Sequence, residues 1–96
     1  MRNTQAHSLN EVINELIDAY RLRGKMAEAQ IRDSWEQVMG KAISNRTHSI
    51  YLHDKVITIH LNSSVLREEL NFKKAEIIKA LNKVVESDAV SDIVFR

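Results

Sequence analysis

Apolar residues recur every three or four positions near the start of the chain, which is the spacing of one face of an α-helix. They are Leu9, Val12, Ile13, Leu16, Ile17 and Tyr20. Ser8 stands before this run and Glu11 follows three positions later, the pattern of a capping box that opens a helix. Gly24 is expected to end this first helix, because glycine enters the left-handed cap conformation without strain.

A second helix is expected to start near Lys25. Its core-facing positions are Met26, Ile31, Trp35, Val38 and Met39. Gly40 is expected to bend this helix before Lys41 rather than to end it.

After Asn45 the apolar period changes to two, which predicts two strands joined by a two-residue turn at Asp54-Lys55. The turn sets His53 opposite Val56, and this register divides the side chains between two faces. The buried face is expected to carry Ile50, Leu52, Ile57, Ile59 and Leu61. The opposite face is expected to carry Ser49, Tyr51, His53, Val56, Thr58 and His60.

One further helix is predicted from about Ser64 to Val85, followed by a short strand in which Ile93 and Phe95 point inward. The core-facing positions of this helix are Leu66, Leu70, Ile77, Leu81 and Val84. The resulting order, α-α-β-β-α-β, predicts an α+β fold. Its three-stranded sheet should have the helices packed on one face, because one apolar face must be covered.

The composition is typical of one soluble domain spanning residues 1–96, with its core from about residue 9. No signal peptide or membrane-spanning segment is recognisable, so a cytoplasmic protein without a membrane partner is expected. The chain has no cysteine, which excludes disulfides, thiol catalysis and thiolate metal sites. A formal net charge of +1 does not by itself demand a polyanionic partner.

The junction of Asn62, Ser63 and Ser64 follows an apolar strand and precedes a helix, a place where a nucleophile or a phosphate loop can lie. Both of those sites need flanking glycines, and no glycine follows Leu52. Asparagine and serine are favoured helix N-caps, so capping is the prediction. No catalytic residue and no cofactor are expected, and the chain is not expected to be an enzyme.

Four histidines raise the question of a metal site. His53 and His60 share a face of the predicted hairpin, about four residue steps apart. At ~3.3 Å per step they are separated by ~13 Å, which is too far for one metal ion. No metal site is therefore expected.

Basic side chains form two groups that are candidates for nucleic-acid binding, although a solvated helix face is the competing interpretation. The candidates are Arg21, Arg23, Lys25 and Arg32 in the first group, and Arg67, Lys73 and Lys74 in the second. The outer sheet face offers the partner-binding candidates Tyr51, His53, Thr58 and His60. This face is free of lysine, arginine and carboxylates, so it suits a protein partner or stacked single-stranded bases.

A recognisable combination of positions runs through the chain, and each keeps its order and spacing. They are Trp35, Val38, Gly40, Ala42, His48, Leu52, Asp54, the alternating run from Val56 to Leu61, Ser63, Ser64, Glu69, Leu70, Leu81, Asn82, Ile93, Phe95 and Arg96. With this combination the chain resembles, from residue 9 to residue 96, the bacterial DciA-like family, long catalogued as a domain of unknown function (family 721). The family often has glycine where Lys55 stands and an aromatic residue where Leu66 stands. The hairpin turn is therefore expected to be less tight.

The resemblance implies a KH-like domain in a protein that recruits or loads the replicative DNA helicase and binds DNA, single-stranded or forked. The chain lacks the G-x-x-G loop with which KH domains clamp a nucleic-acid backbone. Two alternatives therefore stay open, an RNA-binding KH-like module of the ribosome-assembly type and a pure protein-interaction domain. The sequence leaves the oligomeric state, the strand order and the helicase contact surface open.

Overall fold

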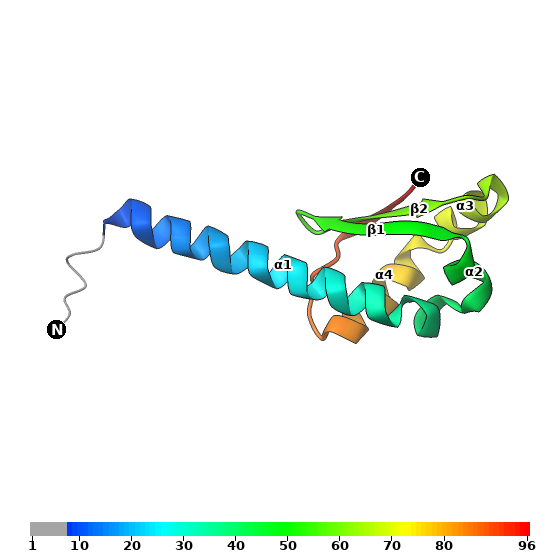
Figure 1. The fold of residues 1–96 in the computed structure, drawn as a ribbon, viewed down its shortest axis with the longest axis horizontal. Helices are drawn as coiled ribbons and strands as arrows, with labels where there is room; N and C mark the ends of the chain where they lie inside the picture. Colours follow the sequence, from blue (N-terminus) through cyan, green and yellow to red (C-terminus); the bar gives the residue numbers. More distant parts are fainter. Residues whose placement is uncertain (1–7) are drawn as a thin grey trace.

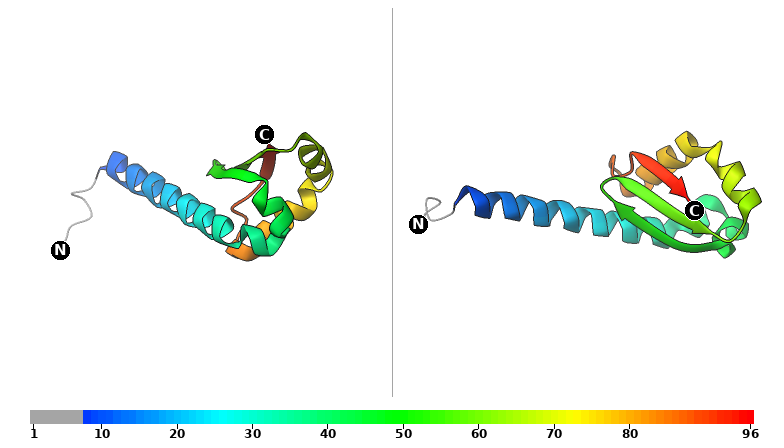
Figure 2. Two further views of the ribbon diagram at one scale, coloured as in Figure 1. Left: turned by 45° about the vertical axis from the view of Figure 1, so that its right-hand side comes forward. Right: turned by 90° about the horizontal axis from the view of Figure 1, so that it is seen from above.

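The computed structural model describes residues 8–96. It is an α+β fold of four helices and three strands (Figure 1). The elements are α1 (Leu9–Met39), α2 (Lys41–Asn45), β1 (Thr47–His53), β2 (Val56–Leu61), α3 (Ser64–Asn71), α4 (Lys74–Val85) and β3 (Asp92–Phe95). The sheet forms one layer, and α1 and α4 lie beneath it (Figure 2). The predicted fold class is confirmed.

The first helix runs without interruption from Leu9 to Met39, so the predicted break at Gly24 is wrong. A glycine inside a helix costs about 1 kcal/mol relative to alanine. Strong helix formers stand on both sides of Gly24, and they outweigh that local cost. Ser8 caps the helix as predicted, since its hydroxyl accepts a hydrogen bond from the Glu11 N–H at 3.2 Å.

Gly40 ends α1 instead of bending it. Its φ of +91° lies outside the helical region, and the short helix α2 starts one residue later. A side chain at this φ would be strained, so glycine is what allows the chain to change direction here.

The hairpin has the predicted register, with His53 paired to Val56 and Ile50 paired to Ile59. Asp54 and Lys55 both have positive φ, +48° and +68°, as in a two-residue type I′ turn. The turn is therefore tight despite the lysine, which contradicts the expectation of a looser turn. Strand β3 pairs with β2 in parallel, which gives the strand order β1-β2-β3.

The single helix predicted over 64–85 is two helices, α3 and α4, separated at Phe72 and Lys73. A straight helix of that length would extend ~33 Å at 1.5 Å per residue. The six residues of β2 span only ~20 Å. The break therefore lets α4 turn back beneath the sheet, where Ile77 and Leu81 are buried.

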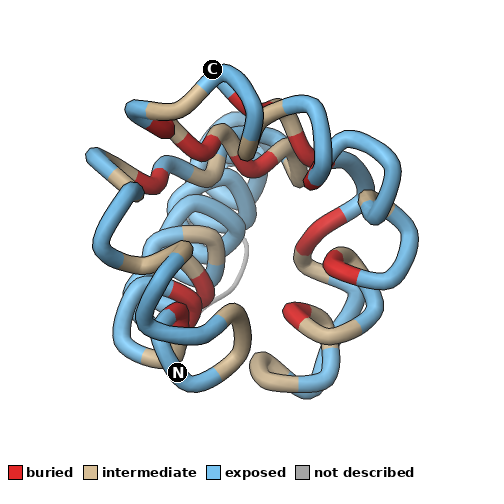
Figure 3. The backbone as a smooth tube through the Cα atoms, turned by 90° about the vertical axis from the view of Figure 1, so that its right-hand side faces the viewer, coloured by how far each residue is buried: buried red, intermediate tan, exposed pale blue. Residues whose placement is uncertain are grey.

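The core lies between the sheet and the helices (Figure 3). Its members are Ile31, Trp35, Ile50, Ile57, Ile59, Leu61, Leu70, Ile77, Leu81, Val90, Ile93 and Phe95. Leu52 and Leu66 are partly buried and pack against this cluster, as predicted, whereas Met26 is 58% exposed and does not belong to it. Asn82 closes the core by pairing with both the N–H and the C=O of Val90, each at 2.8 Å.

The first half of α1 leaves this body and projects beyond it (Figures 1 and 2). Every residue from 9 to 23 is exposed. The radius of gyration is 17.0 Å, whereas a compact chain of this length has ~12–13 Å. We call residues 9–23 the projecting half of α1, and residues 27–96 the body.

Candidate nucleic-acid and partner interface

The sheet has one face without helices, and Tyr51 is its most prominent side chain. Tyr51 is 56% exposed and pairs across the hairpin with Thr58. The Tyr51 ring meets the edge of the His60 ring at a centroid distance of 6.3 Å and an interplanar angle of 87°. Strand β3 places Val94 beside Thr58 on the same face. The predicted partner-binding side chains Tyr51, Thr58 and His60 thus form one neutral surface, which we call the outer sheet face.

His53 lies at the hairpin end of this face. Its Nε2 is 3.3 Å from Asp54 Oδ2, and both side chains are largely exposed. Across residues 8–96 no group of three or more histidine, aspartate or glutamate side chains is arranged to hold a metal ion.

Arg32, a predicted nucleic-acid contact, is engaged with the edge of the sheet. Its Nη2 donates to the Ile50 C=O at 2.7 Å and lies 3.2 Å from Glu28 Oε1. The other Glu28 oxygen accepts from the Leu52 N–H at 2.8 Å. Arg32 and Glu28 thereby occupy two hydrogen-bonding backbone groups on the free edge of strand β1. Another chain therefore cannot use those groups to add a strand to the sheet. Arg32 thus has a structural task in addition to any contact with a ligand.

Arg67 is used in a similar way, because its Nη1 donates to the Leu61 C=O at 2.8 Å. This bond ties the first turns of α3 to the end of β2. The sequence showed the charge of Arg32 and Arg67 but not these carbonyl partners, which come from other elements.

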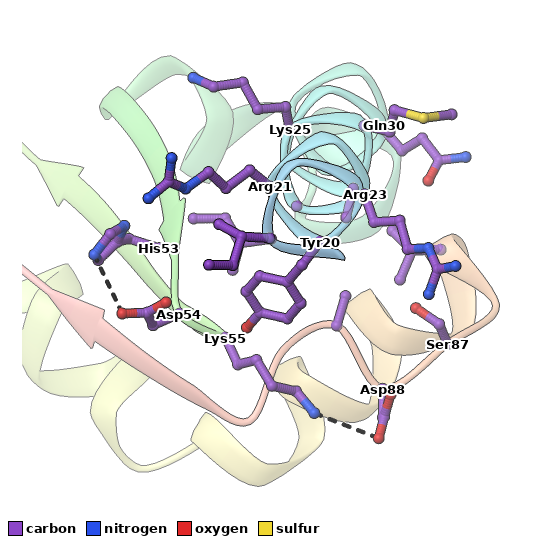
Figure 4. A pocket seen from close by; sticks show the side chains of 17 residues that line it. Tyr20, Arg21, Arg23, Lys25, Gln30, His53, Asp54, Lys55, Ser87 and Asp88 are labelled. Atoms are coloured by element: carbon purple, nitrogen blue, oxygen red, sulfur yellow. Dashed lines mark ion pairs between the residues drawn. The ribbon is translucent and has the colours of Figure 1, made fainter. Parts of the chain in front are cut away.

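Arg21, Arg23 and Lys25 lie on α1 around a groove of about 830 Å³. The groove is bounded by α1, the hairpin turn and the loop of residues 87–89. Figure 4 shows Arg21 and Lys25 on the side of His53, and Arg23 on the side of Ser87. These three side chains extend from different sides of α1, so their charges do not form one continuous basic patch.

Lys73 and Lys74 lie at the α3–α4 junction, at the other end of the body (Figure 1). Phe72 precedes them and is 84% exposed, the highest exposure of any large apolar side chain in the described chain. An aromatic ring next to two lysines combines a stacking surface with phosphate contacts. Phe72 is not among the site residues predicted from the sequence, although it stands off the apolar stripe of Leu66, Leu70 and Ile77.

Ser63 caps α3, and its hydroxyl accepts a hydrogen bond from the Leu66 N–H at 3.2 Å. Replacing Ser63 with alanine should lower the free energy of unfolding by ~1 kcal/mol, because one N–H of the first turn loses its acceptor. Ser64 is the first residue of the helix and serves as the matched control, with an expected change within ~0.5 kcal/mol. Urea titration of both variants tests this, and equal effects would contradict the assignment of Ser63 as the cap.

No helix among residues 8–96 has the length and hydrophobicity that crossing a membrane requires. The search of curated proteins and the search of solved structures returned no match. The model of one protein family, described as "Dna[CI] antecedent, DciA", matches residues 8–95. This match covers the projecting half of α1, the outer sheet face and the α3–α4 junction, which is nearly the whole chain. The chain therefore belongs to the DciA family.

Proposed function

We propose that this protein is a non-enzymatic accessory factor of DNA replication that recruits or loads the replicative helicase and binds DNA weakly. The observation that carries the proposal is the family match over residues 8–95. The family match favours this role over an RNA-binding KH-like module and over a pure protein-interaction domain.

The outer sheet face is the surface we propose for the helicase. It is neutral, it has no helix over it, and it presents an exposed tyrosine beside His60. Tyrosine is among the residues that most often dominate the energy of a protein interface, because its large ring loses little conformational entropy on binding. His53 and Thr58 flank Tyr51 and complete the proposed contact.

The α3–α4 junction is the surface we propose for DNA. Phe72 offers a ring on which a base can stack, and Lys73 and Lys74 offer charges to the flanking phosphates. A ring and two lysines without further base-reading groups favour binding that is weak and tolerant of sequence. Arg21, Arg23 and Lys25 form the second candidate contact, around the groove at the other end of the body.

Co-purification with the replicative helicase of the host tests the proposed role. The wild-type chain should retain the helicase, and Tyr51→Ala should reduce the retained amount at least tenfold. Phe72→Ala is the matched control: it also removes an exposed aromatic ring, but from the opposite end of the body, and should retain the helicase. A wild-type chain that fails to retain the helicase would contradict the role, and a Tyr51→Ala variant that retains it would contradict the surface.

A further inference from the structure

The groove between α1, the hairpin turn and the loop of residues 87–89 has an apolar floor. The floor is made of Tyr20, Gly24 and Ala27 on α1, Leu52 on β1 and Val85 on α4. The volume of about 830 Å³ is at the upper end of the ~300–1,000 Å³ that is usual for ligand sites. Tyr20 projects into this space between the hairpin turn and Asp88, and it is 52% exposed (Figure 4). The groove can therefore bury an apolar side chain of a partner.

An arginine stands on each side of this floor. Successive residues of an α-helix are rotated by ~100°, so Arg21 lies ~100° from Tyr20 in one direction and Arg23 lies ~60° from it in the other. Figure 4 shows the same division, with Arg21 on the side of His53 and Arg23 on the side of Ser87. The two guanidinium groups thus belong to opposite walls of the groove.

The groove has more positive than negative side chains. Four lysine and arginine residues line it against two carboxylates, which leaves an excess of two positive charges. Both carboxylates have neighbours of their own, since Asp88 Oδ2 lies 3.4 Å from Lys55 Nζ and Asp54 Oδ2 lies 3.3 Å from His53 Nε2. The remaining cations take part in no ion pair within residues 8–96, and they are Arg21, Arg23 and Lys25.

This arrangement suits an acidic peptide better than a nucleic-acid strand. A strand needs a continuous line of cations along its backbone, whereas here an apolar floor separates Arg21 from Arg23. A peptide in which an apolar residue stands between carboxylates matches the floor and both walls together. Arginine is also well suited to this partner, because its planar fork binds a carboxylate through two parallel hydrogen bonds.

We propose that the groove binds an acidic segment of another protein. An apolar side chain of that segment fills the space beside Tyr20 and Gly24, and carboxylates before and after it pair with Arg21 and Arg23. This binding does not depend on the proposed role in replication. It takes up the cations of the second candidate DNA contact and leaves the outer sheet face and the α3–α4 junction open.

Gly24 allows the groove to be filled without a change of charge. A Cβ atom built on Gly24 would meet nothing within 4 Å, and leucine is a better helix former than glycine, so Gly24→Leu should fold. The probes are three short dye-labelled peptides that carry phenylalanine, leucine or isoleucine between pairs of aspartates. Fluorescence anisotropy should show binding of at least one probe to the wild type, and Gly24→Leu should weaken it at least tenfold.

The charge requirement is tested with the same probes. The double variant Arg21→Ala, Arg23→Ala should weaken binding at least tenfold, because both walls lose their cation. The matched control is Lys41→Ala, Arg46→Ala, which removes two exposed positive charges around α2 at the other end of the body (Figure 1). This control should change the affinity by less than roughly twofold. Probes with asparagine in place of aspartate should not bind.

Failure of all three probes to bind at up to ~1 mM would overturn the proposal. Equal binding of the asparagine probes, or undiminished binding to Gly24→Leu, would overturn it as well. A groove that rejects the probes but binds oligo(dT), with this binding lost in Gly24→Leu, would belong to DNA instead. Co-purification of the helicase is a separate measurement, so the failure of either proposal is recognisable without the other.

Discussion

Replacing Trp35 with alanine should lower the free energy of unfolding by ~3–5 kcal/mol, a large part of the stability of a small domain. The Trp35 side chain is 2% exposed and lies in the core between α1 and the sheet. Its removal leaves a cavity that the surrounding side chains fill only in part.

The same change also breaks a polar link that holds α1 to the start of the sheet. Trp35 Nε1 donates to Thr47 Oγ1 at 2.9 Å, and Thr47 Oγ1 donates to the Ile43 C=O at 2.8 Å. Trp35→Phe keeps a six-membered ring but removes the indole N–H and the fused five-membered ring, so it should cost ~1 kcal/mol for the lost hydrogen bond plus the cost of a smaller cavity. It should therefore destabilise the fold less than Trp35→Ala does.

Far-UV circular dichroism in a urea titration is the suitable measurement, because Trp35 is the only tryptophan and its fluorescence disappears with the substitution. Phe72→Ala provides the surface control, and its effect should stay within ~0.5 kcal/mol because the ring is 84% exposed. A Trp35→Ala variant within 1 kcal/mol of the wild type would contradict the position of Trp35 in the core.

The sequence predicted the hairpin and most of the core because both depend on short-range patterns. A two-residue turn and a period of two together determine which residue opposes which, and Ile50, Ile57 and Ile59 are buried as that pattern requires. The cap at Ser63 is equally local, since it links residues only three apart.

Other features were predicted poorly, in one case because a local signal was weighed wrongly and in two because they depend on distant neighbours. Gly24 was expected to end a helix because glycine often does so, but the residues on both sides favour continuation. The break at Phe72 follows from the length of the sheet, which the helical pattern of residues 64–85 does not contain. The strand order depends on where β3 pairs after α4, and no local pattern indicates that.

The candidate site residues were also predicted well where a local pattern places them and poorly where long-range contacts do. The alternation along the hairpin placed Tyr51, Thr58 and His60 on one face, and the structure brings them together. Charge alone put Arg32 and Arg67 among the nucleic-acid contacts, and the structure shows both bound to backbone carbonyls. Positive charge in the sequence does not distinguish these arginines from Lys73 and Lys74. The distinction depends on the carbonyl groups of other elements that Arg32 and Arg67 bind in the folded chain.

Single-stranded DNA affinity should fall steeply with salt if the α3–α4 junction binds DNA as proposed. Each phosphate contact contributes roughly 0.7 to the slope of log affinity against log salt, so Lys73 and Lys74 alone predict a slope of about −1.4. One or two further contacts from Arg21, Arg23 and Lys25 make three or four in all and predict a slope of about −2 to −3. The double variant Lys73→Glu, Lys74→Glu should lower the magnitude of this slope by about 1.4, because two contacts are lost.

Phe72→Ala should weaken binding by roughly 1–3 kcal/mol for each base that stacks on the ring, while leaving the salt slope unchanged, because stacking releases no counterions. The matched charge control is Arg21→Glu, Lys25→Glu, which changes the net charge by the same amount at the groove on the other side of the body. A loss confined to this control would move the DNA site to the groove. Affinity that is independent of salt, or unchanged by both charge reversals, would contradict DNA binding and leave a protein-interaction role.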